Sequence, residues 1–89
     1  MKKELIMKNI FREKPVNILI ALYNGPERLF ISKLSKITDC TYPHVSKIIH
    51  FMKDQQIVNL YKEGRTKYIR LTPKGLIIAE NLNDIEKEL

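Results

Sequence analysis

Residues 41–71 read TYPHVSKIIHFMKDQQIVNLYKEGRTKYIRL. The first part, residues 41–55, predicts a helix, because Thr41 can act as its N-cap and proline is tolerated in a first turn. One face of this helix is apolar at the i, i+3, i+4, i+7 spacing, through Val45, Ile48, Ile49 and Met52. The second part, residues 58–71, alternates apolar and polar residues on both sides of Gly64, which predicts two antiparallel strands joined by a short turn. A helix followed by a hairpin with one solvated face is therefore expected.

Two helical segments are expected towards the N-terminus. Residues 1–12 have helical apolar spacing and are expected to form a helix or an extension. Residues 15–24 are apolar nearly all round, which predicts a helix that is buried on more than one side. Gly25-Pro26 then ends that second helix.

A short segment connects these helices to the 41–55 helix. Leu29-Phe30-Ile31 is too brief for a helix and is expected to be a small strand or an extended stretch. Ser32 is then expected to cap a short helix that ends near Thr38. Leu34 and Ile37 are the residues of this helix that are expected to face the core.

The chain closes with another predicted helix, residues 72–89. Thr72 supplies the N-cap and Pro73 the first helical residue. Its apolar residues follow the spacing of helices that pair with a partner helix, and they are Ile78, Leu82, Ile85 and Leu89. Because this pattern covers fewer than two heptads, packing on the parent domain is the alternative to a dimerisation seam.

Length and charge set bounds on the protein. Eighty-nine residues suffice for a single domain, residues 1–89, but not for a second core. Residues 28–70 contain nine lysines and arginines against three acidic residues, a net charge of +6, whereas residues 71–89 have a net charge of −2. A middle segment this basic suits a polyanionic partner, and a solvated basic surface is the alternative.

Several classes of function find no support in the sequence. Cys40 is the only cysteine, so no disulfide can form within the chain, and His44 and His50 lack the neighbours of a metal site. Cys40 is expected to be a small buried turn residue, with a redox sensor as the alternative. No catalytic, cofactor-binding or metal-binding residue is expected, and the chain is not expected to be an enzyme. Neither a signal sequence nor a membrane span is visible, which predicts a soluble cytoplasmic protein.

The order of these elements resembles a winged helix-turn-helix. Residues 32–75 resemble the small bacterial and archaeal transcription regulators of the MarR, ArsR and PadR type, through the motifs TYPHVSK at 41–47, GRTKY at 64–68 and LTPKG at 71–75. Many MarR proteins carry an aspartate two residues before the wing arginine, where this chain has Glu63 next to Gly64. They usually carry a glycine where the recognition helix ends, and here Gln55-Gln56 takes that place.

The resemblance implies a fold and a function. The fold is α+β and mostly helical, a winged helix-turn-helix with a two- or three-stranded antiparallel wing sheet and flanking N- and C-terminal helices. The function is sequence-specific binding of double-stranded DNA and regulation of transcription. The recognition helix, residues 41–55, would occupy the major groove, and the wing, residues 62–67, the adjacent backbone or minor groove.

Twelve residues are expected to contact DNA: Thr41, Tyr42, Pro43, His44, Ser46, Lys47 and His50 on the recognition helix, Arg65, Thr66 and Lys67 on the wing, and Lys33 and Lys36 on the preceding helix. Helix capping is the alternative role for Thr41, and a solvated side chain is the alternative for His50 and for the cations. Asp54 would repel the DNA backbone, so the far end of the recognition helix is expected to lift away from it.

A homodimer is expected, with its two recognition helices in successive major grooves, and no membrane partner. The sequence points to no small-molecule effector. A protein–protein interaction module within a larger assembly is the alternative function, because winged helices also serve as scaffolds. Binding to duplex RNA is less favoured, since a protruding helix cannot read the deep, narrow major groove of A-form RNA.

Overall fold

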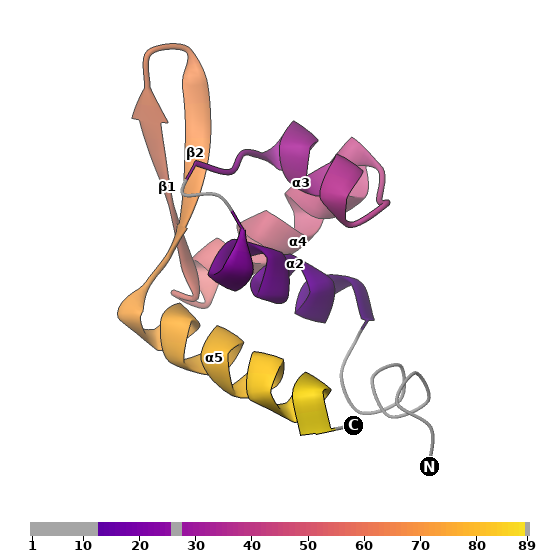
Figure 1. Ribbon diagram of the computed structural model, residues 1–89. Coiled ribbons are helices and arrows are strands. Elements are labelled where there is room, and N and C mark those ends of the chain that lie inside the picture. The colour runs from indigo at the N-terminus through magenta and orange to yellow at the C-terminus, as the bar shows by residue number, and fades with distance from the viewer. Residues whose placement is uncertain (1–12, 26–27, 89) are drawn as a thin grey trace.

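The computed structural model describes residues 13–25 and 28–88, which form four helices and one hairpin (Figure 1). In chain order the elements are α2 (Glu13–Asn24), α3 (Ile31–Ile37), α4 (Tyr42–Asp54), β1 (Val58–Glu63), β2 (Thr66–Leu71) and α5 (Pro73–Glu88). The predicted α+β, mostly helical fold is confirmed for this part of the chain. The expected helix or extension at residues 1–12 lies outside the described residues, as does Leu89 of the predicted seam.

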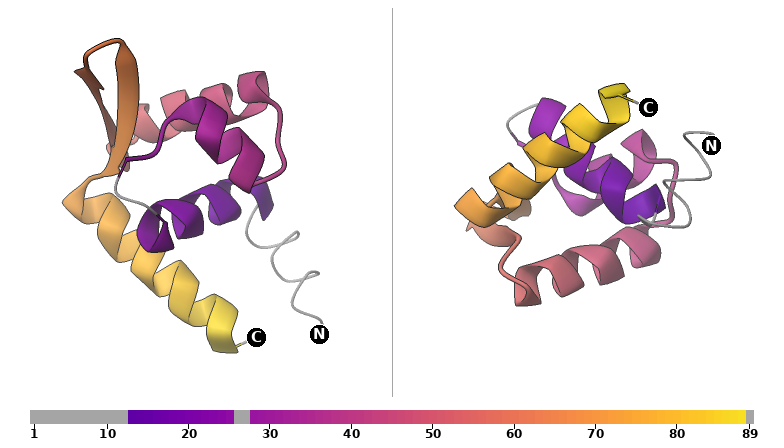
Figure 2. Two further views of the ribbon diagram at one scale, coloured as in Figure 1. Left: turned by 45° about the horizontal axis from the view of Figure 1, so that its top comes forward. Right: turned by 90° about the horizontal axis from the view of Figure 1, so that it is seen from below.

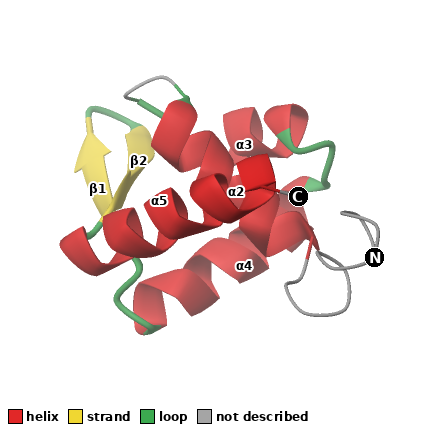
Figure 3. Cartoon of the chain, turned by 60° about the horizontal axis from the view of Figure 1, so that its bottom comes forward, coloured by secondary structure: helices red, strands yellow, loops and turns green. Residues whose placement is uncertain are grey.

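The central helix is α2, with α5 on one side of it and α3 with α4 on the other (Figures 1 and 2). The hairpin projects from the body on the same side as α3 and α4, and Figure 3 shows α4 and α5 from the opposite end of the molecule. The two strands pair antiparallel from Val58 opposite Leu71 to Glu63 opposite Thr66. A third strand is reduced to one bridge, in which the Ile69 amide donates to the Leu29 carbonyl at 2.8 Å.

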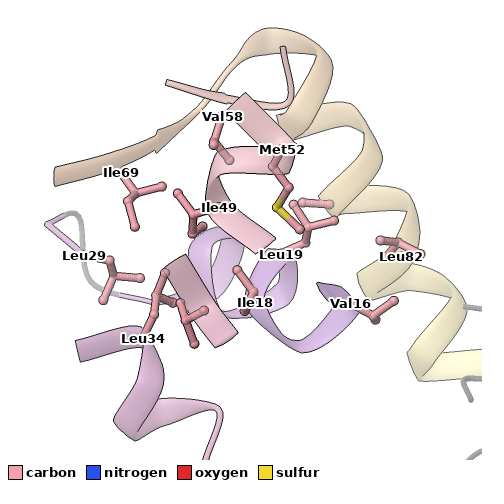
Figure 4. Close-up of a cluster of buried hydrophobic side chains, with 12 residues drawn as sticks. Val16, Ile18, Leu19, Leu29, Leu34, Ile49, Met52, Val58, Ile69 and Leu82 are labelled. Carbon is pink, nitrogen blue, oxygen red and sulfur yellow. The ribbon is translucent and has the colours of Figure 1, made fainter. Parts of the chain in front are cut away.

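The core draws one or more apolar side chains from every element (Figure 4). Its largest fully buried side chains are those of Ile18, Leu29, Leu34, Val45, Ile49, Val58 and Ile69. On α4, Val45, Ile49 and Met52 are buried and Ile48 is partly buried, as the apolar spacing predicted. Because these residues fix the inward face of α4, the opposite face is held towards solvent.

Two expectations for α3 are wrong. The helix begins at Ile31, its N-cap position is Phe30 with no side-chain cap, and the Ser32 carbonyl instead accepts from the Ser35 hydroxyl at 2.7 Å. The bridge at Leu29 holds the backbone extended up to Phe30, so the helix starts earlier than the serine signal suggests.

Ile37 is the second error, since half of its surface is exposed. Thr38, four residues after Leu34, takes the inward position instead. Its side chain is buried because the hydroxyl donates to the Leu34 carbonyl at 2.7 Å, which satisfies the polar group without water. Helical periodicity alone could not distinguish these two neighbours.

Two of the apolar residues that were predicted to form a dimerisation seam on α5 pack within the chain instead. Leu82 belongs to the core, and Ile78 packs against it. Ile85 stays 38% exposed. For the first two residues, packing on the parent domain accounts for the apolar spacing.

The LTPKG motif joins the end of α4 to the start of α5. The Thr72 hydroxyl caps α5, because its oxygen accepts a hydrogen bond from the Gly75 amide at 2.9 Å. The same hydroxyl donates to the Gln56 carbonyl at 2.7 Å, and the Ile57 carbonyl is a second acceptor within reach at 3.0 Å. The Lys74 ammonium donates to the Gln55 carbonyl at 3.1 Å. We call these contacts the Thr72 junction. They satisfy carbonyls of the three residues that follow α4 and lead into β1.

Gln56 occupies the left-handed position that follows α4, with a φ of 60°. This conformation disfavours a residue with a Cβ by about 1–2 kcal/mol, whereas glycine adopts it freely. Glycine also loses more conformational freedom on folding, and this cost of about 0.4–1 kcal/mol offsets part of the gain from relieving the strain. We therefore expect Gln56→Gly to raise the free energy of unfolding by about 0.5–1 kcal/mol, measured by denaturant titration.

Gln55→Gly is the matched control for that prediction. Gln55 has a φ of −86°, so glycine brings no relief there and only its flexibility counts. The free energy of unfolding of this variant should be lower than that of the wild type by about 0.5–1 kcal/mol. If both variants lost stability equally, the left-handed conformation at Gln56 would carry no strain.

Candidate nucleic-acid interface

An open groove of about 460 Å³ separates the hairpin tip from the exposed side of α4. It is lined by Tyr42, Ser46 and His50 of α4, by Leu60, Arg65, Thr66 and Lys67 of the hairpin, and by Phe30, Ile31 and Ser32 at the start of α3. Six of the twelve predicted contact residues, three from the helix and three from the hairpin, therefore share one groove.

The wall formed by α4 is a single stripe of residues spaced by four. Thr41 caps the helix, since its side-chain oxygen accepts from the His44 amide at 3.3 Å, so its capping role is confirmed. Tyr42 is 54% exposed and His50 is exposed, while Ser46 is partly exposed. The stripe presents a phenol, a hydroxyl and an imidazole to the groove.

The wall formed by the hairpin ends in a tight turn. Gly64 has a φ of +64° and is the first of two turn residues, the pattern of a type II′ hairpin turn. Within the part of the chain that the structure describes, neither Arg65 nor Lys67 has an ion-pair partner. Their positive charges are therefore available to an anion in the groove.

Glu63, the acidic residue nearest the tip, pairs elsewhere. Its carboxylate accepts from the Arg28 guanidinium at 2.9 Å, and this hydrogen bond, followed by the charge attraction, raises the pKa of Arg28 above its ordinary value. Arg28 also lies over the Tyr68 ring, 5.3 Å from its centroid. Glu63 thus neutralises Arg28 on the outer face of the hairpin and leaves Arg65 unpaired.

The outer face of the hairpin carries a row of stacked aromatic and cationic side chains. The Tyr61 and Tyr68 rings lie 5.6 Å apart, and the Arg70 guanidinium lies 4.7 Å from the Tyr61 centroid. Phe30 meets Tyr68 edge-on, with 6.1 Å between the centroids. These contacts tie the hairpin to the segment before α3 and so fix the position of the groove wall.

The other six predicted residues lie outside the groove lining. Lys47, Pro43 and His44 are exposed on α4, as are Thr41 at its cap and Lys33 and Lys36 on α3. At about 100° per residue, Pro43, Lys47, His50 and Asp54 point most directly away from the buried face of α4. The predicted helix residues therefore include an outward-pointing group and a group that faces the hairpin, and His50 belongs to both.

Sequence reasoning did not select five residues that help to build this site, one of them Ile31 in the groove lining. Ser32 lines the groove although it was expected only to cap α3, and Phe30 and Leu60 are groove residues whose apolar character gave no functional signal. Arg28 was counted only as part of the basic segment. Its partner Glu63 lies 35 residues away, so only the fold reveals the pair.

Other kinds of site find no candidate here. No cluster of three or more metal-ligand side chains occurs in residues 13–25 and 28–88. Across these same ranges, none of the helices has the length and apolar character needed to cross a membrane. Cys40 is partly buried beside the core, and its thiol lies 3.7 Å from the Thr38 carbonyl.

Comparison with known proteins places this geometry in context. No protein-family model matches the chain. An uncharacterized protein of Archaeoglobus fulgidus is 33% identical over 82 residues, which are 89% of this chain and 86% of that protein. The crystal structure of AF1382 from the same organism superimposes with a TM-score of 0.83 at 31% identity, over 92% of this chain and 93% of that one.

Two transcription regulators share the fold at lower identity. The MarR family transcriptional regulator SPO1453 from Silicibacter pomeroyi has a TM-score of 0.80 at 21% identity over 96% of this chain. The Staphylococcus aureus MepR protein in its DNA complex has a TM-score of 0.79 at 20% identity over 97% of this chain. The matches span 61% of SPO1453 and 65% of MepR. The identity over most of both chains shows that this chain belongs to one family with the Archaeoglobus fulgidus relative, and the superpositions show that it shares its fold with the transcription regulators SPO1453 and MepR.

Proposed function

We propose that this chain is a transcription regulator of the cytoplasm that binds double-stranded DNA sequence-specifically. The observation that carries the proposal is the groove between α4 and the hairpin, into which two unpaired cations and three polar α4 side chains face. With α4 in the major groove and the hairpin on the neighbouring backbone or minor groove, one phosphate strand would run through this groove. The structure of MepR in complex with DNA supports binding of DNA by a protein of this fold.

The proposed contacts fall into three groups. Pro43, Lys47 and His50 point away from the core and would reach base edges, since lysine can donate to guanine O6 and N7. Arg65, Thr66 and Lys67 would hold phosphates or enter the minor groove, with Tyr42 and Ser46 on the opposite wall. Thr41 and His44 at the helix start and Lys33 and Lys36 on α3 would contact the flanking backbone.

The functional unit of this proposal is a homodimer. Two recognition helices in successive major grooves would read half-sites whose centres lie about 34 Å apart. Exposed apolar side chains on α5, among them Leu76, Ile77 and Ile85, offer surface for association. Sedimentation of the free protein would measure this state, and a monomer at the concentration that saturates DNA would contradict it.

The salt dependence of binding tests the proposal. Six to ten phosphate contacts would lower the affinity for a selected duplex by about 10³–10⁵ between 50 and 200 mM salt, because each contact releases counterions. Fluorescence anisotropy with duplex DNA and with duplex RNA of the same sequence would measure it. Equal affinity for the two duplexes, or no binding to either, would reject the proposal.

A protein–protein interaction module is the second candidate, and the outer face of the hairpin favours it. Arg28 and Arg70 stack there on Tyr68 and Tyr61, and arginine and tyrosine are among the residues enriched at the energetic centres of protein interfaces. Under this alternative the basic groove would be incidental. The anisotropy titration separates the two candidates, since only the first requires tight binding to duplex DNA.

A further inference from the structure

His50 is an exposed residue of the groove whose side chain is hydrogen-bonded to its own helix through one ring nitrogen. It is exposed on α4 and faces Arg65 and Lys67 across the groove. Its Nδ1 lies 2.7 Å from the Ser46 carbonyl oxygen one helical turn earlier, with the Ser46 hydroxyl oxygen at 3.4 Å. The imidazole is therefore held by its own helix.

The contact with the carbonyl assigns the proton of the neutral ring. A carbonyl oxygen can only accept, so Nδ1 must carry the hydrogen that it donates to Ser46. A neutral imidazole has one donor and one acceptor nitrogen, which makes Nε2 the acceptor. Within residues 13–25 and 28–88, Nε2 of His50 has no hydrogen-bond partner.

We infer that His50 offers Nε2 to the DNA as an acceptor and selects a base with an exocyclic amino group, adenine or cytosine, at one position in each half-site. The inference rests on the proposed function, because it requires α4 to lie in the major groove. There the hydrogen-bond donors are adenine N6 and cytosine N4, whereas guanine N7 and O6 and thymine O4 are acceptors. A phosphate offers only acceptors as well, so the neutral ring favours a base over the backbone.

Protonation reverses this preference. A doubly protonated ring donates from both nitrogens, so Nε2 would favour guanine, thymine or a phosphate.

Nitrogen-15 NMR of the free protein tests the proton assignment without DNA. The chain has two histidines, so a His44→Gln variant identifies the signals of His50. At about pH 8, where histidine is neutral, we expect the long-range couplings of a ring protonated on Nδ1 and bare on Nε2. A proton on Nε2 would overturn the inference, whatever the protein binds.

Selection of binding sites from a random duplex library tests the reading of the base. At about pH 8, the wild type should enrich adenine or cytosine at one position per half-site by about tenfold, and His50→Ala should lose that preference alone. A motif that His50→Ala leaves unchanged at every position would overturn the inference but spare the proposed function. If the wild type enriched no motif, both would fail, even with the expected NMR result.

Discussion

Gly75→Ala will destabilise the protein by about 3 kcal/mol, although alanine is normally the better helix former by about 1 kcal/mol. A Cβ at residue 75 would lie 1.9 Å from the Ile57 carbonyl oxygen and 2.9 Å from its carbon, both backbone atoms. The first turn of α5 would have to move away, and the Thr72 junction would break, since Thr72 bonds the same carbonyl. At about 4–8 °C per kcal/mol for a small domain, thermal unfolding should shift down by at least about 12 °C.

Asn81→Ala provides the control within the same helix. Asn81 is exposed in the middle of α5, so alanine there changes helix propensity and little else. Its unfolding midpoint should hold or rise slightly. A Gly75→Ala variant that was as stable as the wild type would show that α5 does not need its close approach to Ile57.

The double variant Lys47→Ala/Arg65→Ala will bind the selected duplex at least about 100-fold more weakly than the wild type while remaining folded. Lys47 belongs to the outward-pointing group on α4, and Arg65 lies at the tip of the hairpin. A dimer would lose two copies of each contact, and because Arg65 is the one proposed to hold phosphate, the slope of log affinity against log salt should shrink by about 2. Both side chains are exposed, and removing them should leave the unfolding midpoint unchanged.

Lys87→Glu is the charge-matched control, because it also changes the net charge by two units. Lys87 is in the last turn of α5, which lies at the opposite end of the molecule from the hairpin tip (Figure 1). Affinity and salt slope should change far less than in the double variant. Equal losses in both proteins would mean that overall charge governs binding, and would reject docking through α4 and the hairpin.

Periodicity and capping signals predicted the elements well. The boundaries of α4, of both strands and of α5 follow from local chemistry: the Thr41 and Thr72 caps, the alternation around Gly64 and the apolar stripe of α4. The errors on α3 have a different origin. Ser32 and Ile37 were judged from their neighbours in sequence, but the Leu29 bridge and the buried Thr38 hydroxyl decided their positions.

The sequence predicted which elements form the candidate site, but not which of their side chains face the groove. Sequence placed Tyr42, Ser46 and His50 among the exposed residues of the recognition helix, but it could not tell that these three face the hairpin. Which side chains face the groove depends on the orientation of the hairpin relative to α4. That orientation is fixed by the contacts of Arg28 and Phe30 with Tyr68, which are distant in sequence. Motifs identify the parts, whereas tertiary contacts set their spacing.

The Thr72 junction has a mechanical consequence. Thr72 and Lys74 at the start of α5 donate hydrogen bonds to the carbonyls of three successive residues, Gln55, Gln56 and Ile57. The end of α4, the start of β1 and the start of α5 are therefore joined at one point. A displacement of α5 would therefore move the end of α4 and the base of the hairpin as one unit. If the proposed function holds, the two parts that would contact DNA would keep their spacing within each protomer.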